Sequence, residues 1–138
     1  MGGVLIDTTV LIRAYESESQ DPGAAKAKDA VEAIARRGNG FVAVQNLDEF
    51  AAVLLRRAQP AVEPSRLRDA IAGLEDVFGV LRPGARTLAN ALHGVEKHRL
   101  GFWDSMIWAV ARENGIDEVL TDAPPREQID GVRYRNPL

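Results

Sequence analysis

The chain has 138 residues, of which 46% are hydrophobic and 27% are charged, so we expect one folded domain, spanning residues 1–138, with its own apolar core. It contains no cysteine, which excludes disulfides, zinc–thiolate sites and thiol nucleophiles and is compatible with the cytoplasm. The net charge of −3 argues against a protein that binds nucleic acid through a strongly basic surface. Because Asp7 interrupts the first apolar run and no basic segment precedes it, we expect neither a signal peptide nor a membrane span.

Strand and helix patterns alternate along the whole chain. Short apolar runs rich in β-branched residues indicate strands, and apolar residues three and four apart indicate helices. In chain order, the predicted elements are a strand at 4–6, a helix between the Asp21 cap and Gly38, a strand at 41–44, a helix capped by Asn46, a helix from about Pro64, a weaker strand at 78–81, a helix that ends near His98, a helix from about Phe102 to Gly115, and strands at 118–121 and 132–134. Helices between successive strands imply crossover connections, so the predicted fold class is α/β with a mainly parallel sheet of about five strands.

Four acidic residues lie where functional sites form in parallel sheets, beyond the carboxyl ends of the strands. Asp7 and Asp122 follow predicted strands, and Glu49 and Asp104 lie in the first turns of predicted helices. Taken alone, each has an ordinary structural explanation. Asp7 could cap a helix and Asp122 could belong to a turn, while Glu49 could complete a capping box with Asn46 and Asp104 could interact with the helix dipole. Taken together, all four are expected at one edge of the sheet.

The chemistry of this acid set indicates a divalent cation. Carboxylates gathered at one edge raise one another's pKa values unless a cation neutralises them. Hard oxygen ligands without histidine or cysteine suit Mg²⁺ or Mn²⁺, and such an ion can activate a water and stabilise the charge that develops on a phosphodiester. We therefore predict a hydrolase in which Asp7, Glu49 and Asp104 are catalytic, and in which these three acids and Asp122 bind the metal.

Other polar residues are candidates for supporting roles. Thr121 precedes Asp122 and can offer a hydroxyl that orients a neighbouring carboxylate. Arg56, Arg57 and Arg99 lie near predicted helix ends, where basic side chains are most often solvated. If the acids form a site for a nucleic acid, these arginines become candidates for contacts with its phosphates.

Several segments of the sequence resemble the PIN-domain nucleases, and especially the VapC-like toxins of bacterial and archaeal toxin–antitoxin pairs. The family's first acid position is matched by Asp7 in the segment VLIDTTVLI, and its second by Glu49 in VAVQNLDEFAAVLLRR. The third is matched by Asp104 in LGFWDSMIWAVARENGIDEVLTD. The closing segment IDGVRYRNPL is similar to the tail of one VapC-like subgroup. The order and spacing of these segments carry the resemblance, which covers nearly the whole chain.

The resemblance implies a three-layer α/β/α fold, an endoribonuclease activity that depends on Mg²⁺ or Mn²⁺, a homodimer, and an antitoxin partner that blocks the site. Two positions depart from the pattern. Thr9 replaces the usual Asn or Ser and keeps a hydroxyl that can support the site. Ala123 stands where the subgroup commonly has an acid. Either Asp122 takes the place of that acid from a shifted position, or the fourth metal ligand is missing.

Two alternatives stay open at this point. A phosphatase of the haloacid-dehalogenase type also begins with an acid after an apolar strand, but it needs a second Asp two residues later, where this chain has Thr9. The other alternative is a PIN-like module with a degraded site that acts only in binding, and Ala123 is the residue that favours it.

Overall fold

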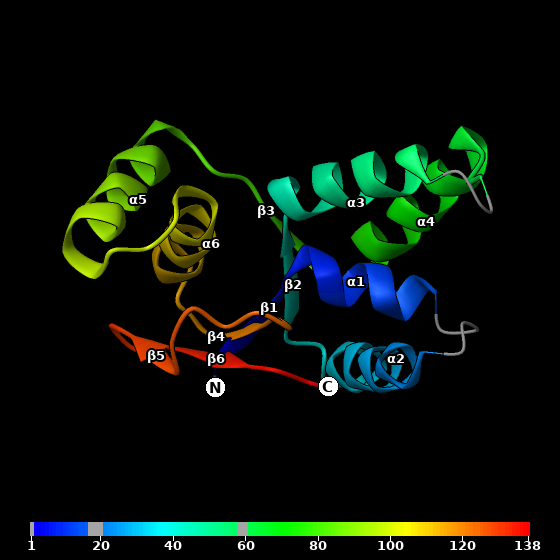
Figure 1. Cartoon of the computed structure of the whole chain (residues 1–138), viewed down its shortest axis with the longest axis horizontal. Coiled ribbons are helices and arrows are strands. Elements are labelled where there is room, and N and C mark those ends of the chain that lie inside the picture. The colour runs from blue at the N-terminus through cyan, green and yellow to red at the C-terminus, as the bar shows by residue number, and fades with distance from the viewer. Residues whose placement is uncertain (1, 17–20, 58–60) are drawn as a thin grey trace.

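The computed structural model describes residues 2–16, 21–57 and 61–138, and within them the chain forms six helices and six strands (Figure 1). The helices are α1 (Thr8–Tyr15), α2 (Pro22–Arg37), α3 (Val44–Arg56), α4 (Pro64–Val77), α5 (Ala85–His98) and α6 (Phe102–Glu113). The strands are β1 (Gly3–Ile6), β2 (Gly40–Ala43), β3 (Gly79–Leu81), β4 (Ile116–Leu120), β5 (Gln128–Ile129) and β6 (Val132–Arg135). No described helix is long and apolar enough to cross a bilayer.

The strands form a single sheet in the order β3-β2-β1-β4-β6-β5. All pairs are parallel except β5 with β6, which are antiparallel. The mainly parallel sheet is therefore confirmed, and the described part of the chain has six strands where about five were expected. The additional strand, β5, has two residues, too few to give a periodic pattern in the sequence.

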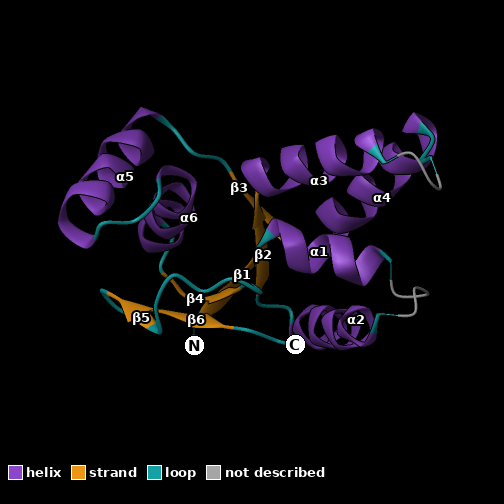
Figure 2. Ribbon diagram, in the orientation of Figure 1, coloured by secondary structure: helices purple, strands orange, loops and turns teal. Residues whose placement is uncertain are grey.

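Helices cover both faces of the sheet, with α5 and α6 on one side and α1 to α4 on the other (Figure 2). The alternation within β1 sets this division, because Val4 and Ile6 belong to one apolar core and Leu5 to the other. The first core also contains Phe50, and the second contains Trp108. Burial on both faces is typical of a parallel sheet, and it gives the predicted three-layer α/β/α fold.

The ends of α2 lie where the sequence predicted them, but the start of α3 does not. Asp21 caps α2 by accepting a hydrogen bond from the backbone N–H of Gly23, and Gly38 ends the helix with φ 73°, a conformation that favours glycine. The prediction that Asn46 caps the next helix is wrong, since α3 begins at Val44. Asn46 instead lies inside the first turn, where its side chain accepts a hydrogen bond from the N–H of Ala43 at 2.9 Å.

Candidate active site

Asp7 lies directly after β1, between the neighbouring strands β2 and β4. It is the N-cap of α1, because its Oδ1 accepts a hydrogen bond from the N–H of Thr8 at 2.9 Å. The hydroxyl of Thr121, at the end of β4, donates to the other oxygen at 2.9 Å. The side-chain amide of Asn46, which is fully buried, donates to Oδ1 at 3.3 Å. The neighbouring Thr8 and two segments distant in the sequence therefore fix the orientation of this carboxylate.

The charge on Asp7 is disfavoured by its surroundings. Burial raises the pKa of the Asp7 carboxyl above its usual 3.8, and the nearby negative charges of Glu49 and Asp104 raise it further. The hydrogen bonds from Thr8 and Thr121 oppose this shift, since they stabilise the charged form. Glu49 and Asp104 are thus close enough to Asp7 to disfavour its negative charge, and a cation at Asp7 would offset this repulsion.

Glu49 lies in the second turn of α3, because the helix begins earlier than expected. The capping-box explanation of this residue is therefore wrong: the side chain that reaches back to the helix start belongs to Asn46. Glu49 is exposed and accepts a hydrogen bond from Gln45 at 2.9 Å. It lines a cavity of ≈ 510 Å³ whose other wall includes Trp103 and Met106 of α6. This cavity lies between the helices that carry Glu49 and Asp104.

Asp104 lies in the first turn of α6, as predicted. The helix leads into β4 through a short turn, so it runs back along the sheet and its first turn is near the carboxyl end of that strand. Close packing against α5 fixes this turn. A Cβ added to Gly94 would lie 2.2 Å from the Oγ of Ser105, and Ser105 donates a hydrogen bond to the carbonyl of Ala91. The Asp104 carboxylate itself is exposed and has no hydrogen bond or ion pair within the described residues.

The carboxylate of Asp122 is bound by side chains of α1. The hydroxyl of Thr9 donates to its Oδ1 at 2.6 Å, and the guanidinium of Arg13 donates to its Oδ2 at 3.3 Å. Arg13 also forms an ion pair with Asp21 at 2.6 Å. This arrangement accounts for both Thr9 and Asp122 without a metal. Asp122 lies beyond the end of β4 at Leu120, where the chain bends, so strand alternation does not fix its direction.

The donor chemistry of Asp7, Glu49 and Asp104 fits Mg²⁺ or Mn²⁺, since all three offer carboxylate oxygens. Their mutual repulsion at Asp7 fits a cation as well. The ligands are not gathered around a single point, however. Within residues 2–16, 21–57 and 61–138, no group of three or more acidic or histidine side chains is arranged to hold a metal ion. A metal would require Glu49 to leave Gln45 and Asp104 to turn inward, and both carboxylates are exposed and able to rotate.

The predicted phosphate-binding arginines lie in different places. Arg57 forms an ion pair with Glu16, and Arg56 is the last residue of α3, about two turns beyond Glu49. Arg99 instead lines a groove of ≈ 360 Å³ that also contains Lys97 and Arg126. Within the described part of the chain, the three cations of this groove, Lys97, Arg99 and Arg126, form no ion pair.

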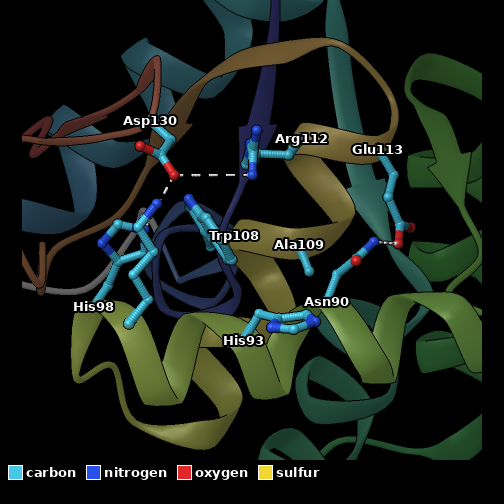
Figure 3. A pocket seen from close by; sticks show the side chains of 9 residues that line it. Asn90, His93, His98, Trp108, Ala109, Arg112, Glu113 and Asp130 are labelled. Carbon is cyan, nitrogen blue, oxygen red and sulfur yellow. Dashed lines mark hydrogen bonds and ion pairs between the residues drawn. The ribbon is translucent and has the colours of Figure 1, made fainter.

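Another cavity, of ≈ 470 Å³, lies between α5 and α6 and is shown in Figure 3. His98 and Arg112 both approach Asp130 there, at 3.1 and 3.9 Å, and the Arg112 guanidinium lies over the Trp108 ring. Arg112 is about 12 Å along α6 from Asp104, at 1.5 Å per residue. The cavity is therefore separate from the acidic edge.

The sequence interpretation missed several residues that contact the acids. Asn46 was interpreted as a helix cap, and its contact with Asp7 gave no separate signal, because the burial of Asn46 depends on the fold. Arg13 gave no signal, because its pairing with Asp122 depends on the tertiary fold. Tyr134 was treated only as part of the last strand. Its hydroxyl is nevertheless buried, and the negative charges of Asp104 and Asp7 raise its pKa.

Comparison with known proteins agrees with this architecture. The model of the PIN domain family matches residues 4–123. The match covers most of the chain, which therefore belongs to the PIN domain family. No curated protein sequence matches the chain.

Solved structures with a similar fold include a VapC toxin and toxin–antitoxin complexes. VapC20 from Mycobacterium tuberculosis, a sarcin–ricin-loop-cleaving toxin, is 20% identical, with a TM-score of 0.66 over 85% of this chain and 87% of that one. A toxin–antitoxin complex from Klebsiella pneumoniae is 19% identical, with a TM-score of 0.72 over 99% and 98%. The DNA-bound VapBC of Salmonella typhimurium is 17% identical, with a TM-score of 0.68 over the whole of both chains. At these identities the likeness establishes the fold.

Proposed function

We propose that the chain is a metal-dependent endoribonuclease that hydrolyses RNA phosphodiester bonds and acts as the toxin of a toxin–antitoxin pair. The observation that carries the proposal is Asp7, a partly buried carboxylate at the end of a central strand whose pKa is raised by burial and by Glu49 and Asp104. Membership of the PIN domain family and the fold shared with VapC20 support it. A phosphatase of the haloacid-dehalogenase type is not proposed, because the chain matches the PIN domain family.

In this proposal Asp7, Glu49 and Asp104 hold Mg²⁺ or Mn²⁺, and Asp122 supports the site from outside it. When bound, the ion supplies the positive charge that activates water and offsets the charge developing on the phosphodiester. Thr121 and Asn46 keep the Asp7 carboxylate fixed through their hydrogen bonds. The basic groove with Arg99 binds phosphates of the RNA strand outside the reacting group.

The proposed partners are an RNA substrate, a cognate antitoxin protein and a second copy of this chain. The antitoxin is supported by the toxin–antitoxin complexes that share the fold. Light scattering of the purified chain tests the homodimer, and co-purification with the product of the neighbouring gene tests the antitoxin.

The activity is tested by incubating the chain with a ribosomal RNA fragment that contains the sarcin–ricin loop and with an unrelated structured RNA. We expect cleavage in Mn²⁺ or Mg²⁺, no cleavage with a chelator present, and no cleavage by a folded Asp104→Asn variant. A binding-only module is the second candidate, favoured by Ala123 and by the lack of a gathered ligand set in the described residues. That candidate predicts intact RNA under all of these conditions and no heat of Mn²⁺ binding.

A further inference from the structure

The hydroxyl of Tyr134 is one of the few buried polar atoms without a hydrogen bond. Within the described residues, only the Tyr134 hydroxyl and the Oδ1 of Asn39 are buried side-chain atoms that lack a partner. A buried tyrosine hydroxyl normally finds a partner, and leaving one unsatisfied is destabilising. A structural role in the core needs only the ring, so the hydroxyl requires a separate explanation.

The sheet places Tyr134 below the acids. Tyr134 of β6 pairs with Val119 of β4, and Val119 pairs with Leu5 of β1. All three contribute to the core between the sheet and α5–α6. Asp7 comes two residues after Leu5, on the side to which Leu5 points. The Tyr134 ring therefore lies beneath the edge where Asp7 follows β1 and where α6 begins.

The electrostatics agree with this placement. Burial raises the pKa of the Tyr134 hydroxyl far above its usual 10, and the charges of Asp104 and Asp7 raise it further, offset in part by Arg126. The hydroxyl therefore keeps its proton throughout the physiological range and can only act as a neutral group. Asp104, close enough to influence it, has no partner of its own among the residues described. An unused donor thus lies near an unused acceptor.

We propose that the Tyr134 hydroxyl is the hydrogen-bond donor that holds the Asp104 carboxylate in its working orientation when the acidic edge binds a divalent cation. The inference rests on the proposed function, because it assigns Tyr134 as a positioning residue that acts through Asp104. Carboxylates that bind metals are usually held by such outer hydrogen bonds, and losing one typically weakens metal binding or activity by about 10- to 100-fold.

The test compares Tyr134→Phe with Tyr15→Phe, which removes the hydroxyl of the chain's other tyrosine and keeps the ring that contacts Phe50. Mn²⁺ alone is the probe, and its affinity is measured by isothermal titration. We expect Tyr134→Phe to bind Mn²⁺ about 10- to 100-fold more weakly than the wild type, with an unfolding temperature equal to or above that of the wild type. Tyr15→Phe should bind Mn²⁺ normally. Wild-type affinity in Tyr134→Phe would overturn the inference.

A double variant identifies the group through which Tyr134 acts. If the hydroxyl works through Asp104, adding Tyr134→Phe to Asp104→Asn should cause no further loss of Mn²⁺ affinity. A full additional loss would overturn this assignment. Cleavage by Tyr134→Phe should also recover in part at high Mn²⁺ concentration. Equal Mn²⁺ affinity of the wild type and Asp104→Asn would instead refute the proposed function, and the inference with it.

Discussion

Asp7 and Asp122 are acids of the same type that follow neighbouring strands, β1 and β4, yet the fold uses them differently. Among the described residues, Asp7 accepts hydrogen bonds only from neutral groups, on Thr8, Thr121 and Asn46, and burial and other acids raise its pKa. Asp122 is paired with a cation, Arg13, and turned toward α1. Position after a strand thus brings an acid to the edge, but its partners decide whether its charge is satisfied. An unsatisfied charge is available to a ligand, and a paired one is not.

The largest effect is expected at Asp7. Asp7→Asn keeps the shape of the side chain and remains a good N-cap, but it removes the charge that the proposed metal needs. We expect RNA cleavage to fall by about 100-fold or more, since even outer hydrogen-bond partners contribute 10- to 100-fold. The matched variant Asp122→Asn should cleave RNA nearly as well as the wild type. Similar losses in both variants would mean that the two acids are not distinct in function.

Glu49 should show a smaller loss of activity. Its carboxylate is exposed and held by Gln45, and it has no capping role because α3 begins at Val44. We expect Glu49→Gln to reduce cleavage about tenfold while changing the free energy of unfolding by less than about 0.5 kcal/mol. Circular dichroism with urea, alongside the cleavage assay, measures both. A clear loss in the free energy of unfolding with full cleavage activity would mean that Glu49 has a structural role and not a catalytic one.

The sequence was sufficient to predict features that depend on local pattern. The acid after the Val4–Ile6 run and the Asp21 cap of α2 follow from the strand pattern and from the capping rules. The pairing of Asp122 with Arg13 does not follow from them, because Asp122 was expected with the other acids at the edge of the sheet. The start of α3 was misplaced because the side chain of Asn46 accepts a hydrogen bond from Ala43, which precedes the helix, instead of capping a helix that follows it. The contact between Asn46 and Asp7 and the orphan hydroxyl of Tyr134 depend on which strands are neighbours. Sheet order comes from the packing of the whole chain, so no local pattern reveals these contacts.

The pairing of Asp122 should matter for stability more than for metal binding. Arg13 is 36% exposed and Asp122 is 16% exposed, so this ion pair is screened in part by solvent. We expect Asp122→Ala to lower the free energy of unfolding by about 0.5–1 kcal/mol and to weaken Mn²⁺ binding much less than Asp7→Ala does. Thr9→Val, which removes only the hydroxyl that donates to Asp122, should have a smaller effect in the same direction. Equal Mn²⁺ losses in Asp122→Ala and Asp7→Ala would make Asp122 a direct ligand.

The smallest expected effect is a difference in how stability depends on pH, measured without metal. The folded-state pKa of Asp7 is raised above 3.8, chiefly by burial. Its contribution to stability is therefore most favourable below that pH and declines as the pH rises through the folded-state pKa, because the folded protein resists losing the proton. Asn cannot ionise, so the unfolding temperature of Asp7→Asn relative to the wild type should increase from about pH 4 to about pH 7.

Asp130 provides a control of opposite sign. A hydrogen bond from His98 lowers the pKa of the Asp130 carboxyl, so its contribution is present above the unfolded-state pKa and is lost as the pH falls through the folded-state pKa. As the pH rises through the folded-state pKa of Asp130, the wild type should gain stability relative to Asp130→Asn. Opposite slopes in the two variants would show that the repulsion at Asp7 is local to the acidic edge. Parallel slopes would mean that both reflect the net charge of the chain.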